Sequence, residues 1–277
     1  MGCSTLINGK PVTVLDVNDR GVQYGDGLFE TIAITQGQPE FLGRHLLRLE
    51  SGCKRLHIDY PGHQILSEDI KFLCSERQSA VVKLQITSGN SLRGYRRPSC
   101  IVPNRIVTCR SLAHQSQSPH QNGIRLRLCR HRLSVNPTFA GIKHLNRLDQ
   151  VIARNEWCCD DIQEGVMLDA DGYVIEGTMS NLFLVSEGRL ITALLDRAGV
   201  AGIVRSVILE QAHQHGVDVS IQRVRLADVY NADEIFMTNS VIGIWPVRQF
   251  ETLQYQPGLL AQDARSWVLN AVDRLKA

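Results

Sequence analysis

The chain has 277 residues, of which 43% are hydrophobic and 21% are charged, as in an ordinary globular protein with one large or two modest domains. Its 30 lysines and arginines nearly balance 28 acidic residues, so a net charge of +2 gives no reason to expect binding to nucleic acid or to a membrane surface. No apolar run is long enough to cross a membrane, and the first residues lack the pattern of a signal peptide. We therefore expect a cytoplasmic protein that binds a small molecule in a pocket.

The eight cysteines are scattered along the chain and include no Cys-x-x-Cys pair. The histidines do not cluster with acids or cysteines at the spacing of metal ligands. We therefore predict no metal site and no structural disulfide, and we expect reduced cysteines that are buried as small hydrophobic residues.

The first part of the chain alternates short strands, turns and amphipathic helices. Asn8-Gly9 is a strong signal for a two-residue turn, and Leu46, Leu49 and Cys53 recur at helical spacing. The expected strands cover residues 5–7, 12–14, 29–35, 40–42, 81–87 and 100–109, and the expected helices cover 45–57 and 68–76. This pattern predicts an α+β domain.

Residues 111–123 are polar and have no apolar periodicity, which predicts a linker between a first domain at 1–110 and a second at 124–277. The second part has expected strands at 124–133, 166–168, 173–175, 182–185, 190–192 and 234–237, and expected helices at 145–157, 202–215 and 259–275. Many short strands followed by helices indicate a barrel or a curled sheet with helices on its outside.

Lys143 lies between an apolar run and the helix expected at 145–157, where we expect its side chain to be partly buried. Lysine is unfavourable at a helix start, because the helix dipole prefers anions there. A desolvated lysine loses its proton readily and can form a Schiff base with a carbonyl cofactor. A solvated surface lysine is the alternative, and the spacing alone leaves both open.

Glu176 follows the apolar Val174 and Ile175 and precedes Gly177, so we expect a carboxylate at the buried end of a strand. A buried carboxylate needs a partner, and the protonated nitrogen of a pyridine ring is a suitable one. A carboxylate at the rim of a hairpin is the alternative.

Several segments could bind anions. Gly199–Ile203 leads into a helix whose first N–H groups can bind phosphate, and Thr238-Asn239-Ser240 could add hydroxyl donors. Arg48 lies beside the apolar stripe of its helix, where a buried guanidinium usually holds a carboxylate or a phosphate. Arg93-Gly94-Tyr95-Arg96-Arg97 is a basic loop that could receive substrate carboxylates. Solvated turns and a solvated arginine are the alternatives, so each signal is weak by itself.

The combination of these motifs resembles the fold-type IV pyridoxal-phosphate enzymes, which include branched-chain aminotransferases, D-amino acid aminotransferases and aminodeoxychorismate lyases. The resemblance extends over nearly the whole chain and is carried by segments 19–31, 45–49, 141–156, 176–183 and 202–205. It implies an α+β fold with a small α+β domain followed by a larger pseudo-barrel domain, pyridoxal 5'-phosphate bound between them, and a homodimer as the working unit.

The resemblance also implies roles for individual residues. Lys143 would form the Schiff base with the cofactor, and Glu176 would pair with the pyridine nitrogen. The phosphate would be held by Arg48, the backbone amides of Ile203 and Val204, and the Ser240 hydroxyl. The substrate side would be lined by Tyr24, Phe29, Arg93, Tyr95 and Asn239.

Within the family, Ile142–Leu148 and Arg93-Gly94-Tyr95 are most similar to the aminodeoxychorismate lyases. This similarity implies a carbon–oxygen lyase that converts 4-amino-4-deoxychorismate to 4-aminobenzoate and pyruvate, a step of folate biosynthesis. Residues 93–98 lack the histidine that D-amino acid aminotransferases usually carry, whereas Glu176-Gly177-Thr178 and Phe29-Glu30-Thr31 are shared with aminotransferases. An aminotransferase of D-amino or branched-chain amino acids is the alternative, and a non-catalytic binding protein with the same fold is another.

Overall fold

A computed structural model describes residues 4–112 and 118–274, which form both helices and strands and so confirm the predicted α+β class. The described residues divide into two compact units. The first runs to residue 112 and also includes Ile142–Asn146, whereas the second holds the remaining residues. No helix of the described residues is long and apolar enough to cross a membrane.

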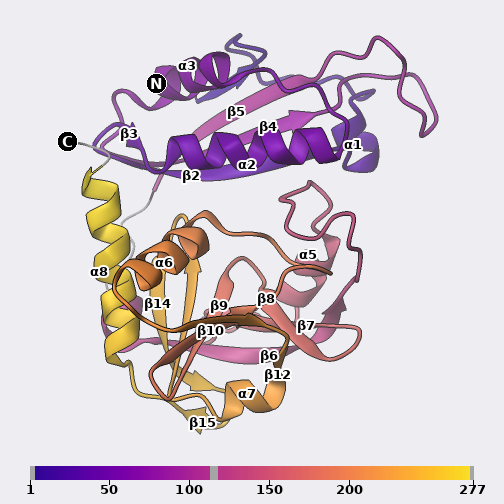
Figure 1. Cartoon of the computed structure of the whole chain (residues 1–277). Helices are drawn as coiled ribbons and strands as arrows, with labels where there is room; N and C mark the ends of the chain where they lie inside the picture. Colours follow the sequence, from indigo (N-terminus) through magenta and orange to yellow (C-terminus); the bar gives the residue numbers. More distant parts are fainter. Residues whose placement is uncertain (1–3, 113–117, 275–277) are drawn as a thin grey trace. The chain divides into compact units, whose positions relative to one another are not determined.

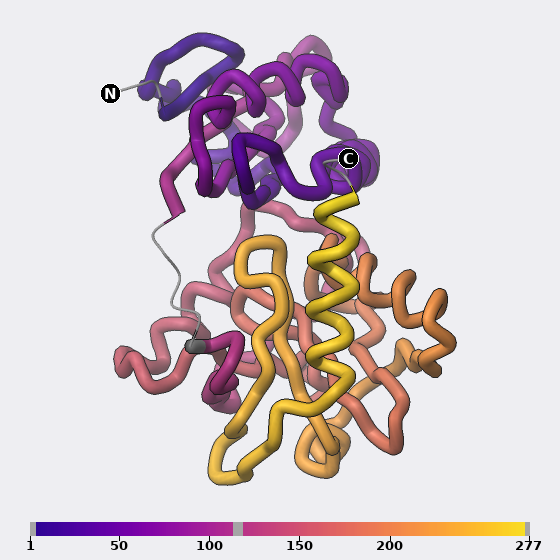
Figure 2. The backbone as a smooth tube through the Cα atoms, turned by 90° about the vertical axis from the view of Figure 1, so that its left-hand side faces the viewer, coloured from indigo at the N-terminus to yellow at the C-terminus, as the bar shows by residue number. Residues whose placement is uncertain are grey.

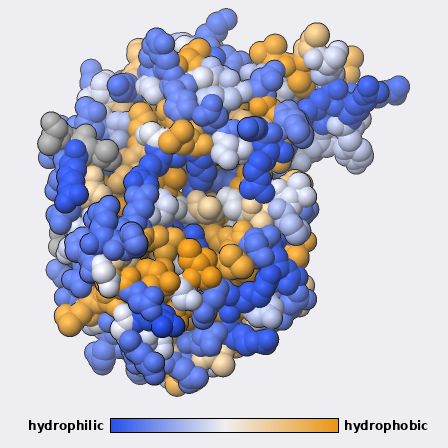
Figure 3. Space-filling view, in the orientation of Figure 1, coloured by the Kyte–Doolittle hydropathy of each residue, from blue (hydrophilic) through white to orange (hydrophobic). Residues whose placement is uncertain are grey.

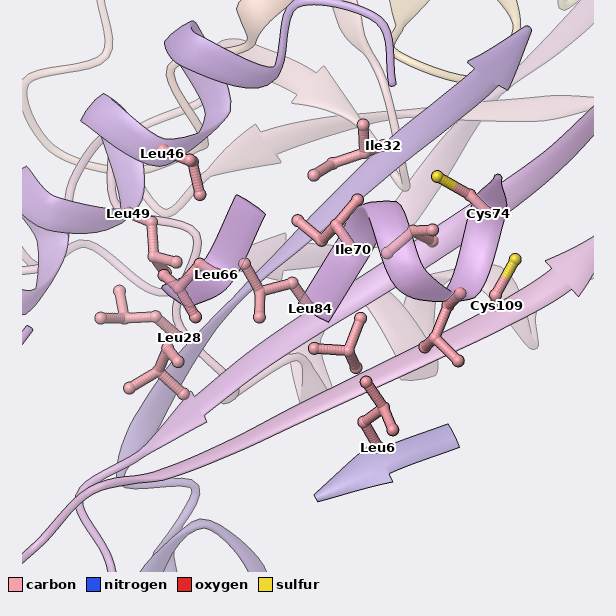
Figure 4. Close-up of a cluster of buried hydrophobic side chains, with 14 of the residues drawn as sticks. Leu6, Leu28, Ile32, Leu46, Leu49, Leu66, Ile70, Cys74, Leu84 and Cys109 are labelled. Carbon is pink, nitrogen blue, oxygen red and sulfur yellow. The ribbon is translucent and has the colours of Figure 1, made fainter. Parts of the chain in front are cut away.

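The first unit is built on a five-stranded antiparallel sheet in the order β1-β5-β4-β2-β3 (Figure 1). Its strands are β1 (Thr5–Ile7), β2 (Gly27–Thr35), β3 (Gln38–Pro39), β4 (Ser79–Thr87) and β5 (Asn104–Ser111), and its helices are α1 (Arg20–Tyr24), α2 (Leu42–Arg55) and α3 (His63–Cys74). The apolar faces of α2 and α3 supply one half of the core, and the inward positions of the strands supply the other. Figure 4 shows these side chains meeting in one cluster that includes Leu28, Leu49 and Ile70.

The second unit contains a ten-stranded mixed sheet whose main path runs β11-β10-β9-β13-β14-β6-β7-β8-β12. Its strands are β6 (Ile124–Leu133), β7 (Glu164–Asp169), β8 (Tyr173–Gly177), β9 (Asn181–Ser186), β10 (Arg189–Ala193), β11 (Val219–Gln222), β12 (Val224–Arg225), β13 (Glu234–Asn239), β14 (Gly243–Phe250) and β15 (Leu253–Gln254). Its helices are α4 (Ser118–Asn122), α5 (Leu148–Arg154), α6 (Ile203–Gln214), α7 (Leu226–Tyr230) and α8 (Leu259–Arg274).

This sheet curls so that β8 approaches β9 across the short loop that joins them, and apolar side chains fill its interior. Parallel pairing joins β6 to both β7 and β14, and the other neighbours on the path are antiparallel except β10 and β11. Helix α8 packs along β14 and against α6, as Figures 1 and 2 both show. The predicted curled sheet with helices outside is therefore confirmed.

One predicted element is wrong in a way that bears on the site. The helix expected at 145–157 is limited to Leu148–Arg154, because residues 143 and 145 are hydrogen-bonded to β2 in an extended segment. Leu148, Val151 and Ile152, whose helical spacing is typical of a core-facing stripe, are 73%, 51% and 51% exposed. The apolar spacing in this segment therefore marks a surface stripe.

Other differences are local. Residues 12–14 form no strand, because the Asn8-Gly9 turn closes on an Ile7–Lys10 bridge and β1 pairs with β5 instead. Helix α4 lies inside the stretch 111–123 that composition predicted as linker, and residues 113–117 lie outside the described residues. Cys100, Cys158 and Cys159 are exposed, so burial was wrongly expected for them.

We predict that Leu49→Ala lowers the free energy of unfolding by about 2–5 kcal/mol, because Leu49 is 1% exposed and its removal leaves a cavity between α2 and the sheet. The matched control is Leu47→Ala on the same helix, where the side chain is 60% exposed and the expected change is within about 0.5 kcal/mol. Urea unfolding followed by circular dichroism measures both changes. Equal losses for the two variants would contradict this description of the core.

Candidate active site

Lys143 lies in a short extended segment that continues the sheet of the first unit beside β2. The N–H of Phe29 donates to the Lys143 carbonyl at 3.0 Å, and the N–H of Leu145 donates to the Gly27 carbonyl at 2.9 Å. The Lys143 side chain is half-buried, as predicted, and its Nζ lies 4.3 Å from the centroid of the Phe29 ring. The backbone of β2 therefore fixes Lys143 against one of the predicted substrate-side residues.

Arg48 forms an ion pair with Glu30, which projects from β2 into the unit and is 1% exposed. Its Nε donates to Oε1 at 2.8 Å and its Nη2 donates to Oε2 at 2.5 Å. Burial by itself raises the pKa of Glu30, but the charge of Arg48 and the hydrogen bonds from His45 and Arg48 lower it to about 2. Arg48 is therefore held in place by an ionised carboxylate, and the solvated alternative is excluded.

His45 completes this group and is as deeply buried as Glu30. Burial lowers the pKa of His45, so the neutral ring donates its Nδ1–H to Glu30 Oε2 at 2.6 Å. Its Nε2 is buried and has no hydrogen-bond partner within the described part of the chain. The charge of Lys143 also lowers the pKa of His45, which places this ring and Lys143 within electrostatic reach of each other.

The basic loop between β4 and β5 projects from the end of the sheet in Figure 1, and Figure 3 shows hydrophilic residues at its outer end. Arg93 and Tyr95 are exposed on it, and the Tyr95 ring contacts the edge of the Tyr24 ring at a centroid distance of 5.4 Å. The loop is anchored from inside by Arg20, which is 3% exposed and donates to the carbonyls of Gly94 and Tyr95. The contact between Tyr24 and Tyr95 brings together two of the predicted substrate-side residues, and Arg93 lies on the same loop.

Asp26 joins Arg20 to Arg97 at the base of the same loop. Arg20 Nε donates to Asp26 at 2.8 Å, and Arg97 makes a bidentate pair with the same carboxylate. Burial opposes ionisation of Asp26, but hydrogen bonds from Arg97, Ser88 and Arg20 lower its pKa to about 2. Arg97 therefore anchors the loop, and Arg93 and Arg96 are its exposed cations.

Glu176 lies near the end of β8 in the second unit and is 4% exposed, as its place after an apolar run predicted. The backbone N–H of Val200 donates to its Oε2 at 2.8 Å. Burial lowers the pKa of Arg147 and of Arg205, and the charge of Glu176 opposes both changes. The rim alternative for Glu176 is therefore wrong, and its carboxylate lies in a buried, positively charged surrounding.

The segment that leads into helix α6 lies beside this carboxylate, because Val200 of that segment donates to it. Ile203 and Val204 are its first two residues, and Gly202 caps it without a side chain. Asn181 Nδ2 donates to the Val200 carbonyl at 2.9 Å, and a Cβ at Gly202 would collide with Asn181 Oδ1. Glycine is therefore required at position 202 for Asn181 to hold the loop that leads into the helix.

Ser240 lies in the turn after β13, and its side chain is half-buried. The neighbouring Asn239 shapes this turn, because its Oδ1 accepts the N–H groups of Val241 and Ile242 at 2.8 and 2.9 Å. Asn239 Nδ2 donates to the Met179 carbonyl at 3.0 Å. Asn239 therefore acts on the backbone around Ser240, in addition to any contact it makes with a substrate.

The family model for amino-transferase class IV matches residues 27–250, which is most of the chain and includes both units. The chain belongs to this family. Its members are pyridoxal-phosphate enzymes of fold-type IV, so the fold expected from the resemblance is confirmed.

Individual relatives agree with this assignment. The chain is 34% identical to the aminodeoxychorismate lyase of Vibrio harveyi over 87% of this chain and 89% of that protein. It is 31% identical to a putative branched-chain-amino-acid aminotransferase of Methanocaldococcus jannaschii over 88% of this chain and 87% of that protein. The crystal structure of 4-amino-4-deoxychorismate lyase from Pseudomonas aeruginosa is 42% identical, covers 97% of this chain and 99% of its own, and superposes with a TM-score of 0.93.

Sequence reasoning gave no role to several buried charged residues that shape the site. Glu30 was noted only as part of a shared motif, although its place among the apolar residues of β2 could have shown that it points inward. Arg20 and Asp26 lie in the same motif segment, 19–31, but their contacts with the loop at 91–97 are distant in sequence, and Glu164 gave no signal at all. The contacts of these residues became visible only in the folded chain.

We predict that Glu30→Gln lowers the free energy of unfolding at neutral pH by about 3–5 kcal/mol, because it removes the buried negative charge that pairs with Arg48. The folded-state pKa of Glu30 lies below the unfolded value of 4.5, so its stabilisation is present above pH 4.5 and is lost as the pH falls towards 2. The difference between wild type and variant should therefore shrink across that range in urea unfolding experiments.

The matched control is Glu50→Gln. Glu50 is an exposed carboxylate on α2, the helix that carries Arg48, and its change should have little effect on stability at any pH. Equal stability of wild type and Glu30→Gln at neutral pH would show that the Glu30–Arg48 pair does not stabilise the fold.

Proposed function

We propose that this protein is a pyridoxal-phosphate-dependent lyase that converts 4-amino-4-deoxychorismate to 4-aminobenzoate and pyruvate. The observation that carries the proposal is the 42% identity to a 4-amino-4-deoxychorismate lyase of known structure over nearly the full length of both chains. The presence of both Lys143 and Glu176, the two residues that the chemistry needs, supports an active enzyme over a non-catalytic relative.

The side chains present suit this cofactor. Lys143 offers a half-buried amine, and Glu176 offers a buried carboxylate for a protonated ring nitrogen. We propose that the phosphate is bound by Arg48, the first amides of α6 at Ile203 and Val204, and the Ser240 hydroxyl, because guanidinium groups, helix N-terminal N–H groups and hydroxyls each suit a phosphate dianion. We assign these residues to cofactor binding on this basis.

The proposed reaction needs one proton to be moved and one bond to be broken. Pyridoxal phosphate, when bound, supplies a ring that accepts electrons from the carbon bearing the substrate nitrogen. Lys143 would hold the cofactor through its amine, and its Nζ, when not bonded to the cofactor, would take the proton from that carbon. Hydrogen bonds to β2 fix the Lys143 backbone. The carbon–oxygen bond to the enolpyruvyl group then breaks as the six-membered ring becomes aromatic. Lys143 returns its proton to the departing group, which completes pyruvate without a water molecule.

The substrate carries two carboxylates, so the exposed cations of the loop at 91–97 are suited to receive it. Arg93 is offered at the surface by a loop whose base is fixed by Arg20, Asp26 and Arg97. We assign Arg93, Tyr95, Tyr24, Phe29 and Asn239 to the substrate side. A fixed base lets the loop present these groups with little loss of entropy when substrate binds.

An aminotransferase is the second candidate, favoured by the 31% identity to a putative branched-chain aminotransferase. It would use the same Lys143 and Glu176, but would return the proton to the cofactor. Two results together would favour this candidate. Branched-chain or D-amino acids would convert the cofactor to its amine form, and aminodeoxychorismate would yield no 4-aminobenzoate.

We also propose that the working unit is a homodimer in the cytoplasm. The exposed stripe of Leu148, Val151 and Ile152 on α5 is an apolar surface of the kind that protein interfaces cover. The described cysteines are free thiols, which suits a reducing compartment.

We predict that Lys143→Ala lowers the rate of pyruvate release from aminodeoxychorismate by more than about a thousandfold, because it removes the amine that bonds the cofactor and carries the proton. The matched control is Lys83→Ala, since Lys83 Nζ also lies over the Phe29 ring, at 5.2 Å, but is exposed on β4. A coupled assay for pyruvate measures both. Substantial activity in Lys143→Ala, or an equal loss in Lys83→Ala, would contradict the assignment.

We predict that the double variant Leu148→Asp and Ile152→Asp shifts the protein from dimer to monomer, because burying two carboxylates in an interface is costly. Leu259→Asp, at a position that is 75% exposed on α8, is the control and should leave the dimer intact. Sedimentation velocity gives the mass of each species. A wild-type monomer, or a double variant that is still dimeric, would contradict the proposed interface.

A further inference from the structure

Glu164 is the first residue of β7, and its carboxylate is fully buried. Its Oε1 accepts hydrogen bonds from the N–H of Gly165 at 2.9 Å and from the N–H and hydroxyl of Thr178 at 3.0 and 2.5 Å. Its Oε2 accepts from the N–H of Met179 at 3.1 Å and from the Ser180 hydroxyl at 2.7 Å. One side chain therefore takes five hydrogen bonds, four of them from the loop at 178–180.

All five donors are neutral, and no ion pair to Glu164 occurs within the part of the chain that is described. Burying a carboxylate without a counter-ion is costly, and the five hydrogen bonds offset part of that cost. Gly177 shows how closely the loop approaches, because a Cβ there would lie 3.0 Å from Glu164 Cδ. The contacts of Glu164 therefore restrict the loop at 177–180 to a defined conformation.

The loop that Glu164 holds is connected to two of the proposed cofactor ligands. It follows Glu176 directly in the chain, so the position of the loop sets the end of β8 that carries Glu176. The Met179 carbonyl accepts from Asn239, which in turn shapes the turn that contains Ser240. A shift of Met179 would therefore move Asn239 and, with it, the turn that contains Ser240, which is assigned to the phosphate.

The far end of the loop leads to the third ligand. Asn181, the next residue, donates to the Val200 carbonyl, and the Val200 N–H donates to Glu176. Residues 199–202 lead directly into α6, whose first amides are assigned to the phosphate. Hydrogen bonds and the short chain segments between them thus connect Glu164 to the groups proposed for both ends of the cofactor.

We infer that Glu164 is a positioning residue for the cofactor: without touching it, the carboxylate fixes the loop 177–181 and thereby sets Glu176, the Ser240 turn and the start of α6. The inference rests on the proposed function, because it needs these three groups to bind pyridoxal phosphate. Loss of the carboxylate weakens binding of the whole cofactor, and the loss is not confined to one end of it.

Glu164→Gln tests the inference because it keeps the size of the side chain and replaces one acceptor oxygen by a donor. The amide then faces either the Met179 N–H or the Thr178 N–H, so the loop must move. We expect the dissociation constant for pyridoxal phosphate, measured by fluorescence titration of the cofactor-free protein, to rise by about 10- to 100-fold, the range seen when groups behind metal ligands are removed. The visible absorbance of the bound cofactor should also change.

The matched control is Glu156→Gln in the same unit. Glu156 also accepts two backbone N–H groups, those of Arg130 and His131, and pairs with Arg127. Within the described residues, none of its hydrogen bonds or ion pairs involves the loop at 177–181. Its loss should lower the melting temperature and leave the dissociation constant within about twofold of wild type. An equal loss of affinity in both variants, or an unchanged affinity in folded Glu164→Gln, would overturn the inference.

If Glu164→Gln does not fold, Thr178→Val with Ser180→Ala removes two of the five donors and leaves the carboxylate and its backbone bonds in place. This double variant should weaken cofactor binding by several-fold, and wild-type affinity would overturn the inference. Product assays keep the two claims separate. Wild-type protein that binds the cofactor but releases no 4-aminobenzoate refutes the lyase proposal, and the affinity comparison still decides the role of Glu164.

Discussion

The buried carboxylate of Glu164 is the constraint on which the second unit's part of the site depends. The strands of a sheet are joined by loops, and a loop as short as 177–180 cannot form a hydrophobic core that fixes its conformation. Glu164 fixes the conformation of this loop, because its carboxylate accepts five hydrogen bonds. Glu176 and the turn at Ser240 then take their places from a loop that has a single geometry.

In the first unit, two other carboxylates, those of Glu30 and Asp26, hold neighbouring side chains in place. Glu30 holds Arg48 and His45 from the centre of β2, and Asp26 holds both arginines at the base of the substrate loop. Glu30 thus holds a residue proposed to bind the cofactor, whereas Asp26 holds the two arginines that anchor the loop carrying Arg93. Lys143 is positioned differently, because main-chain hydrogen bonds to β2 fix its backbone.

Much of the fold could be predicted from local pattern. β6 was predicted with its observed bounds, and α2 was placed within a few residues, because alternation and helical spacing report on burial directly. The pattern misled at α5, where Leu148, Val151 and Ile152 have core-like spacing but lie on the surface. Spacing shows that a face is apolar, and it does not show what covers that face. β14 was missed because Pro246 and Arg248 interrupt its apolar run.

The site was predictable in a similar, uneven way. Lys143 and Glu176 stood out because a charged residue in an apolar setting is costly, and their roles came from the family resemblance. The acids behind the site, such as Glu164 and Glu30, could not be given roles, because their function depends on contacts between segments distant in sequence. The division of the chain at 111–123 stays a prediction of the sequence.

The most direct test of the account is a single turnover of wild-type protein, loaded with pyridoxal phosphate and mixed with less than one equivalent of 4-amino-4-deoxychorismate. The account predicts that 4-aminobenzoate and pyruvate appear together in equal amounts, and that the cofactor returns to its starting spectrum. Recovery of unchanged substrate, or conversion of the cofactor to its amine form without 4-aminobenzoate, would contradict it.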